Sequence, residues 1–142
     1  APFETEGDEN PYAIHADLQD CMQALVGIIR TASELEAALG KLAGFRERLA
    51  RVRVEGNRQF NPGWHLALDL HSMLTVSEAC ARSALIREES RGGHTREDFP
   101  KTSAEWGTKN VVTRRTGDGL VLTTEPLPVM PDDLRALVEA KE

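Results

Sequence analysis

A long helical pattern of apolar residues between Asn61 and Glu89 constrains the fold more than any other feature of the chain. Asn61 and Pro62 mark the start of the helix, because asparagine caps a helix and proline suits its first turn. A helix continuing to Glu89 would be roughly 42 Å long at 1.5 Å per residue. Its apolar residues cover more than one stripe, so we expect it to be the most buried helix of the fold. These residues are Trp64, Leu66, Leu68, Leu70, Met73, Leu74, Val76, Cys80, Ala81, Ala84, Leu85 and Ile86.

A first helix precedes this one and begins with the same pair of residue types, at Asn10 and Pro11. Apolar residues follow at the spacing that places them on one helix face, and we expect the helix to run to about Arg30. They are Ile14, Leu18, Cys21, Met22, Leu25, Ile28 and Ile29. Residues 1–9 are largely polar and acidic, and we interpret them as the remnant of a linker.

A second helix has two possible starts, because two capping boxes overlap in the sequence. In one box Thr31 is followed by Glu34, and in the other Ser33 is followed by Glu36. Apolar residues then alternate in steps of three and four, which is typical of the seam of a helical bundle. We expect this helix to end at Gly56. The apolar residues are Leu35, Leu39, Leu42, Phe45, Leu49 and Val52.

The three predicted helices are joined by short connections, so that neighbouring helices should run antiparallel. A chain of 142 residues suffices for one domain with its own hydrophobic core. We therefore predict a mainly α fold, an antiparallel three-helix bundle of the spectrin-repeat kind over residues 10–100. The two cysteines, Cys21 and Cys80, lie within helical patterns and are expected to be buried, reduced thiols.

The remaining residues, 101–142, are predicted to form a C-terminal β-hairpin and a tail. Two β-prone runs, at 111–113 and 120–124, flank a Gly-Asp-Gly sequence at 117–119 that favours a hairpin turn. Prolines then force an extended stretch. A short terminal helix is expected to begin at Asp132.

The charge balance argues against a nucleic-acid-binding surface. There are 17 Lys and Arg residues and 23 Asp and Glu residues, a formal net charge of −6. Phosphate binding needs clustered basic residues on one face, and the basic residues here have acidic neighbours. No apolar run approaches the roughly 18 residues of a membrane span. We therefore expect a soluble chain with no nucleic-acid partner and no direct membrane insertion.

A stretch at residues 89–100 concentrates charge where the long helical pattern stops. The glycine pair at 92–93 is interpreted as a helix terminator, because glycine accepts the left-handed conformation that closes a helix. Arg91, His94 and Arg96 then lie where cations complement the negative end of the helix dipole. The stretch is Glu89, Ser90, Arg91, Gly92, Gly93, His94, Thr95, Arg96, Glu97, Asp98, Phe99 and Pro100.

No catalytic or metal-binding motif is recognisable in the sequence. A glycine-rich dinucleotide motif, a phosphate-binding P-loop and a zinc-binding HExxH are all missing. His65 and His71 are six residues apart and do not share a helix face, which argues against a two-histidine metal site. Ser72 and Ser77 lie within a helical pattern, without the exposed turn that a nucleophile needs. We therefore predict no catalytic, cofactor-binding or metal-binding residue in this chain.

Three stretches of the chain resemble one protein family. They are Asn10-Pro11-Tyr12, then Asn57-Arg58-Gln59-Phe60-Asn61-Pro62-Gly63-Trp64-His65, and finally the charged stretch at 89–100. Together they are similar to the C-terminal domain of the flavoprotein subunit of succinate dehydrogenase or fumarate reductase. The Glu-Ser-Arg-Gly-x-His-x-Arg-x-Asp pattern is shared with L-aspartate oxidase. The Asn-Pro-Gly-Trp-His sequence points more narrowly to the succinate dehydrogenase and fumarate reductase branch.

The resemblance implies a parent enzyme that interconverts succinate and fumarate. In that family FAD is held by an N-terminal domain, and none of the catalytic residues maps onto this chain. The resemblance thus implies FAD in the full-length parent and none bound by this fragment, which should be inert alone. The implied partners are the FAD-binding domain of the same polypeptide, an iron–sulfur subunit that passes electrons to quinone, and a membrane anchor. The complex would lie on the cytoplasmic side of the cell membrane, or on the matrix face in mitochondria.

Arg91, His94, Arg96 and Asp98 are the candidate docking residues of the chain. We expect them to contact the FAD-binding domain, because the glycine pair lets the backbone approach closely and the charged groups offer hydrogen-bond partners. Two alternatives remain open. One is the C-terminal domain of a related flavoenzyme such as L-aspartate oxidase, and the other is a free-standing helical adaptor that binds a partner helix in a groove.

Overall fold

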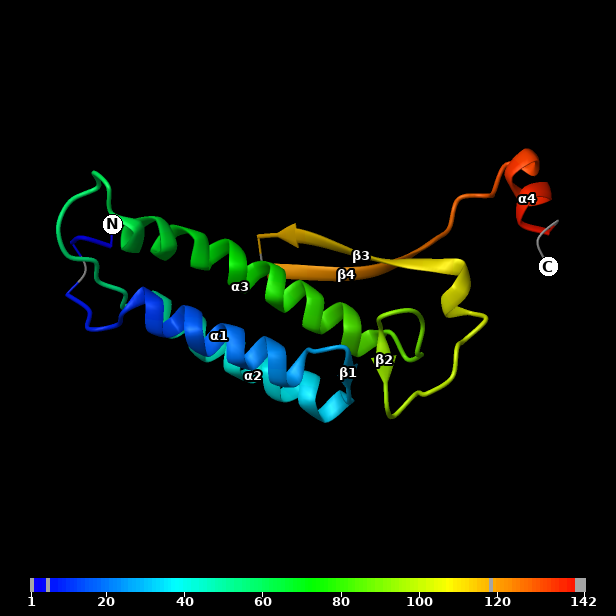
Figure 1. Ribbon diagram of the computed structural model, residues 1–142, viewed down its shortest axis with the longest axis horizontal. Helices are drawn as coiled ribbons and strands as arrows, with labels where there is room; N and C mark the ends of the chain where they lie inside the picture. The colour runs from blue at the N-terminus through cyan, green and yellow to red at the C-terminus, as the bar shows by residue number, and fades with distance from the viewer. Residues whose placement is uncertain (1, 5, 118, 140–142) are drawn as a thin grey trace.

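Three long helices form an antiparallel bundle in the computed structural model, which describes residues 2–4, 6–117 and 119–139 (Figure 1). The helices run up, down and up and pack against one another, which confirms the predicted mainly α three-helix bundle. Their bounds are α1 (Pro11–Leu25), α2 (Ala32–Leu49) and α3 (Pro62–Ile86).

The helix starts are those that the sequence predicts. The side chains of Asn10 and Asn61 cap α1 and α3, and each cap is followed by a proline in the first turn. At the start of α2 the Thr31 N–H donates to the Glu34 carboxylate at 2.7 Å, and the Glu34 N–H donates to the Thr31 hydroxyl at 3.3 Å. The box of Thr31, and not that of Ser33, therefore begins α2.

The first helix ends earlier than predicted. It stops at Leu25, whereas the apolar pattern favoured a helix to Arg30. The chain leaves the helix because the next residues form a strand, β1 (Ile29–Arg30), which pairs in parallel with β2 (Thr95–Arg96). This pair closes the end of the bundle at which α3 ends (Figure 1).

The second helix also ends early, at Leu49 and not at the predicted Gly56. The residues after it turn back onto the N-terminal segment, where Val52 forms a parallel β-bridge with Glu9. The Glu9 carboxylate accepts a hydrogen bond from Arg48 Nε at 3.0 Å, which ties the same segment to α2.

Residues 1–9, interpreted from the sequence as a linker remnant, include several that contact the bundle. The Phe3 ring stacks on Trp64 with 6.3 Å between ring centroids, so this segment packs against the first turn of α3. Ala1 and Thr5 lie outside the described residues.

The third helix ends at Ile86, before the predicted Glu89, and the glycine pair does not cap it. Gly92 has a φ of +58°, which is the left-handed region, but it lies in a tight turn further along the chain. In this turn the Arg91 N–H donates to the His94 carbonyl at 2.8 Å, and the His94 N–H donates to the Arg91 carbonyl at 3.1 Å. The left-handed glycine therefore shapes this turn and leaves the end of α3 to be capped by other groups.

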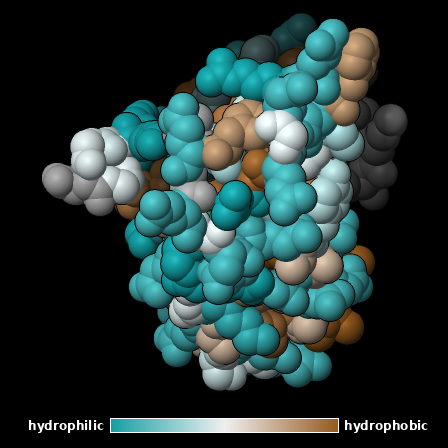
Figure 2. All heavy atoms as spheres, turned by 90° about the vertical axis from the view of Figure 1, so that its left-hand side faces the viewer, coloured by the Kyte–Doolittle hydropathy of each residue, from teal (hydrophilic) through white to brown (hydrophobic). Residues whose placement is uncertain are grey.

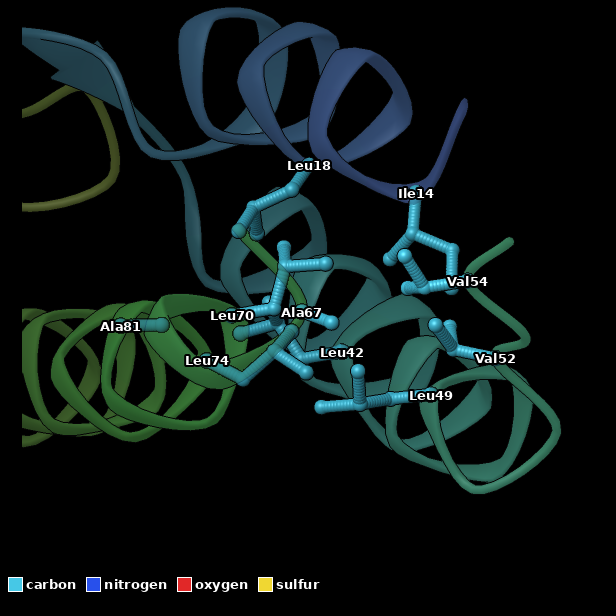
Figure 3. Close-up of a cluster of buried hydrophobic side chains, with 10 residues drawn as sticks. All are labelled: Ile14, Leu18, Leu42, Leu49, Val52, Val54, Ala67, Leu70, Leu74 and Ala81. Atoms are coloured by element: carbon cyan, nitrogen blue, oxygen red, sulfur yellow. The ribbon is translucent and has the colours of Figure 1, made fainter. Parts of the chain in front are cut away.

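Apolar side chains from all three helices meet between them and form the core (Figure 3). The prediction for the cysteines was half wrong: Cys21 is buried, Cys80 is exposed, and both are free thiols. The residues of the core are Ile14, Leu18, Leu42, Leu49, Val52, Val54, Ala67, Leu70, Leu74 and Ala81.

The predicted C-terminal hairpin is present and lies beside α3 (Figure 1). After a short 3₁₀ helix, η1 (Trp106–Thr108), strand β3 (Lys109–Thr116) pairs antiparallel with β4 (Gly119–Pro126). Asp118, in the predicted turn, lies outside the described residues. An extended stretch then leads to α4 (Asp132–Glu139), the predicted terminal helix, which lies apart from the bundle.

Candidate functional site

The charged stretch at 89–100 lies at the end of the bundle where α3 ends and α2 begins. Its backbone is fixed to β1 and to Ile28, the residue before it, by two hydrogen bonds. The Thr95 N–H donates to the Ile28 carbonyl at 3.1 Å, and the Glu97 N–H donates to the Arg30 carbonyl at 3.0 Å. These contacts hold the stretch against a segment more than sixty residues earlier in the chain.

Arg96 is buried, with 1% of its surface exposed, and its guanidinium caps the end of α3. Nη1 donates to the carbonyls of Ala84 and Leu85 at 2.9 and 2.8 Å. Carbonyls in the last turn of a helix have no partner within the helix, and a cation complements the dipole there. The guanidinium also lies over the Phe99 ring, 5.0 Å from its centroid. The structure thus confirms the helix-end role predicted for Arg96, whereas the same prediction for Arg91 was wrong, because its side chain binds Glu89 and the Ser103 carbonyl.

Asp98 joins this arginine to the start of α2. Arg96 Nε and Nη2 donate to the two carboxylate oxygens of Asp98 at 2.8 and 2.7 Å, and the Ala32 N–H donates to one of them at 3.1 Å. The hydrogen bonds from Arg96, helped by that from Ala32, outweigh burial and lower the pKa of Asp98 to about 2. The ion pair therefore links the C-terminal end of α3 to the N-terminal end of α2.

A second network surrounds Glu89, whose side chain is completely buried. Its carboxylate accepts hydrogen bonds from Arg87 Nη2 at 2.5 Å, Arg91 Nε at 3.1 Å and the Ser103 N–H at 2.8 Å. Burial alone would raise the pKa of Glu89, but these three donors outweigh it and lower the pKa to about 2. Glu89 is therefore a buried carboxylate that stays ionised at neutral pH.

His94 is half-buried and contacts the backbone of Arg87, one of the arginines that bind Glu89. Its Nε2 lies 3.0 Å from the Arg87 carbonyl, and because a carbonyl only accepts, Nε2 carries the proton. Burial, with the charges of Arg30, Arg87 and Arg96, lowers the pKa of His94, although the hydrogen bond to the Arg87 carbonyl opposes this change. The imidazole is thus favoured in its neutral form.

The four predicted docking residues all lie at this end of the bundle, but they are not equally accessible. Arg96 is buried and His94 is half-buried, whereas the side chains of Arg91 and Asp98 are 43% and 31% exposed. Sequence reasoning missed the organising role of Glu89. The available signal was its position between two arginines, one two positions before it and one two positions after it.

A hollow at the opposite end of the bundle has the wrong charge for FAD. Asp8, Glu9 and Glu55 line this hollow together with Arg53, and Figure 2 shows this end to be mostly hydrophilic. Glu9 is paired with Arg48 and Arg51, so the hollow has only a small excess of negative charge, which disfavours the binding of a diphosphate. Within the described part of the chain, no group of three or more His, Cys, Asp or Glu is placed to hold a metal ion. Of the helices described, not one combines the length and apolar character that crossing a bilayer requires.

Several known proteins are similar to this chain in sequence and in fold. One chain of the fumarate reductase (CoM/CoB) of Methanothermobacter marburgensis is 37% identical over 110 residues, which are 78% of this chain and 20% of that protein. The fumarate reductase flavoprotein subunit of Mycobacterium tuberculosis is 35% identical over 125 residues, 87% of this chain and 21% of that protein. A solved structure, Mycobacterium smegmatis Sdh1 in complex with UQ1, superposes with a TM-score of 0.92 at 48% identity.

That superposition covers 98% of this chain and 24% of the Sdh1 chain. The chain thus spans about a fifth to a quarter of the length of the relatives it matches. Residues 15–135 match the protein family described as fumarate reductase flavoprotein C-term. Because this match covers most of the sequence, the chain belongs to the family of fumarate reductase flavoprotein C-terminal domains.

Proposed function

We propose that this chain is the structural C-terminal domain of an FAD-dependent succinate dehydrogenase or fumarate reductase flavoprotein, and that the catalytic residues lie outside it. The observation that carries the proposal is the superposition on Sdh1, in which nearly the whole chain matches about a quarter of a larger protein.

The parent protein would hold FAD, interconvert succinate and fumarate, and pass electrons through an iron–sulfur subunit to quinone. Two neighbours by structure support a quinone-linked complex: the Mycobacterium smegmatis protein is described in complex with UQ1, and another is a quinol–fumarate reductase with menaquinol molecules. The parent would lie on the cytoplasmic side of the cell membrane, held there through a membrane anchor. This chain would contribute structure and contacts within that complex.

The four candidate docking residues divide into two accessible and two less accessible side chains. Arg91 and Asp98 would offer accessible charges to the FAD-binding domain. Arg96 and His94, which are less exposed, would hold this segment in position. The partial exposure of the Arg91 and Asp98 side chains supports this division. Arg91→Ala in the full-length flavoprotein should lower its thermal midpoint more than the same change lowers that of the 142-residue chain. Equal losses in both proteins would show that Arg91 acts only within its own domain.

The gene sequence distinguishes the proposed flavoprotein domain from the alternative, a free-standing helical adaptor. If the proposal holds, the reading frame upstream of the codon for Pro2 continues into a glycine-rich dinucleotide motif, and the full-length product has a flavin absorption spectrum. A start codon directly upstream, with no flavin in the product, would contradict the proposal and favour the adaptor.

A further inference from the structure

Arg30 in β1 is a half-buried arginine whose side chain has no hydrogen bond and no ion pair with any residue that the structure describes. Its Nε is buried and lacks an acceptor, the one such side-chain atom found among the described residues. A guanidinium has five N–H donors and no acceptor, and a buried donor without a partner costs about 1–3 kcal/mol. Buried polar groups in folded proteins nearly always have a hydrogen-bond partner, and a partner outside this domain would account for the unpaired Nε.

Two anions at this end of the bundle are already paired, and two exposed carboxylates near Arg30, those of Asp20 and Glu97, form no ion pair with it in the part of the chain that the structure describes. Glu89 accepts from Arg87 and Arg91, and Asp98 accepts from Arg96. Burial, followed by the charge of Arg96, lowers the pKa of Arg30, while Cys80 opposes this change.

The residues beside Arg30 are apolar and exposed. Ile28 and Ile29 are 69% and 62% exposed, and Ile28 borders a shallow hollow that is also lined by Arg30, Met22 and the polar side chains of Gln19, Asp20 and Gln23. Two large exposed apolar side chains next to one arginine are typical of protein interfaces, where arginine is enriched. The backbone here is held in place by the pairing of β1 with β2.

We propose that Arg30 pairs with a carboxylate on the FAD-binding part of the full-length flavoprotein, and that Ile28 and Ile29 form the apolar part of the same contact. The proposal rests on the proposed function, since it takes the partner from the remainder of that polypeptide. Charge complementarity demands an anion. A second copy of this chain is a poor partner, because a twofold contact over this patch would bring Arg30 against Arg30.

The share of chain length supports an occupant from the same polypeptide. The relatives are several times longer than this chain, which covers 20–24% of them. A tethered partner acts at high effective concentration, so that a contact of modest area suffices. An ion pair shielded by two isoleucines is also stronger than one in open solvent.

The test compares variants of the full-length holoprotein, prepared without the iron–sulfur subunit. Backbone hydrogen exchange at residues 28–30 is measured for the wild type, Arg30→Gln, Arg30→Lys and Arg115→Gln. Arg115 is the matched control, because it is an exposed arginine without a hydrogen bond or ion pair to the described residues. Arg30→Gln should speed exchange by about tenfold, Arg30→Lys should speed it less, and Arg115→Gln should leave it unchanged.

Equal exchange in the wild type and Arg30→Gln would overturn the inference. So would protection at residues 28–30 that appears only after the iron–sulfur subunit is added, because the carboxylate would then belong to that subunit. Flavin content and succinate oxidation of the wild type are measured first. A wild type that lacks both would count against the proposed function. If the wild type has both, but Arg30→Gln leaves hydrogen exchange at residues 28–30 unchanged, the result would count only against this contact.

Discussion

The guanidinium of Arg96 and the carboxylate of Asp98 form a bidentate ion pair, with N–O distances of 2.8 and 2.7 Å. The arginine binds carbonyls in the last turn of α3 and the aspartate binds the first N–H of α2. Each charge thus meets the helix end of opposite polarity. One ion pair two residues apart in sequence therefore fixes the relative position of two helices at one end of the bundle.

Asp98→Ala should destabilise the 142-residue chain by about 2 kcal/mol, because it leaves the buried Arg96 without its carboxylate. The loss is smaller than for a fully buried pair, since the Asp98 side chain is 31% exposed. Urea unfolding provides the measurement. Glu97→Ala is the matched control: its carboxylate is exposed, and the loss should stay below about 0.5 kcal/mol. Similar losses for the two variants would contradict the role assigned to the pair.

Acid should weaken the fold through Glu89. Its pKa in the folded chain is about 2, below the ordinary value of 4.5, so the unfolded chain binds more protons between these values. The stabilisation is present above pH 4.5 and is lost as the pH falls towards 2. Denaturation midpoints measured across this window should fall with pH for the wild type. The fall should be shallower for Glu89→Gln and unchanged for Glu88→Gln, whose side chain is exposed.

The start of α2 allows a comparison of two neighbouring hydroxyls. Thr31→Ala should cost about 1 kcal/mol, because the Thr31 hydroxyl accepts the Glu34 N–H and caps the helix. Ser33→Ala should cost clearly less, since Ser33 lies inside the helix and does not cap it. Thermal unfolding of both variants would check this order, and a larger loss for Ser33→Ala would show that the capping box is misassigned.

Two leucines on α3 separate core packing from surface exposure. Leu74 is completely buried, so Leu74→Ala should cost about 2–5 kcal/mol through lost contacts and the cavity left behind. Leu68 is 45% exposed on the same helix, and Leu68→Ala should cost much less. Chemical denaturation of the two variants tests the placement of the helix faces, which would be wrong if the losses were equal.

The sequence was most informative about where helices begin. Local signals suffice there, since Asn10, Thr31 and Asn61 cap their helices through residues two or three positions away. The helix ends were less predictable, because distant segments decide them. α1 is followed by β1, whose partner Thr95–Arg96 lies far along the chain. No local sequence pattern predicts that pairing.

The sequence predicts where the charged site lies, but not how its side chains are arranged. The density of charge at 89–100 located it, and the helix-end role of Arg96 followed from dipole reasoning. Burial of Glu89 and isolation of Arg30 could not be read from the sequence, because both depend on which donors and acceptors the tertiary fold brings together. Charged side chains that look equally solvated in the sequence differ widely in burial, because the pairing of β1 with β2 determines which of them are enclosed.

The most direct test of the central claim is a succinate–fumarate assay with an artificial electron carrier. It compares the full-length flavoprotein that contains this domain with the 142-residue chain alone. We predict activity and a flavin spectrum in the full-length protein, and neither in the 142-residue chain. A full-length protein that binds FAD but leaves succinate and fumarate unchanged, or turnover by the 142-residue chain alone, would contradict the account.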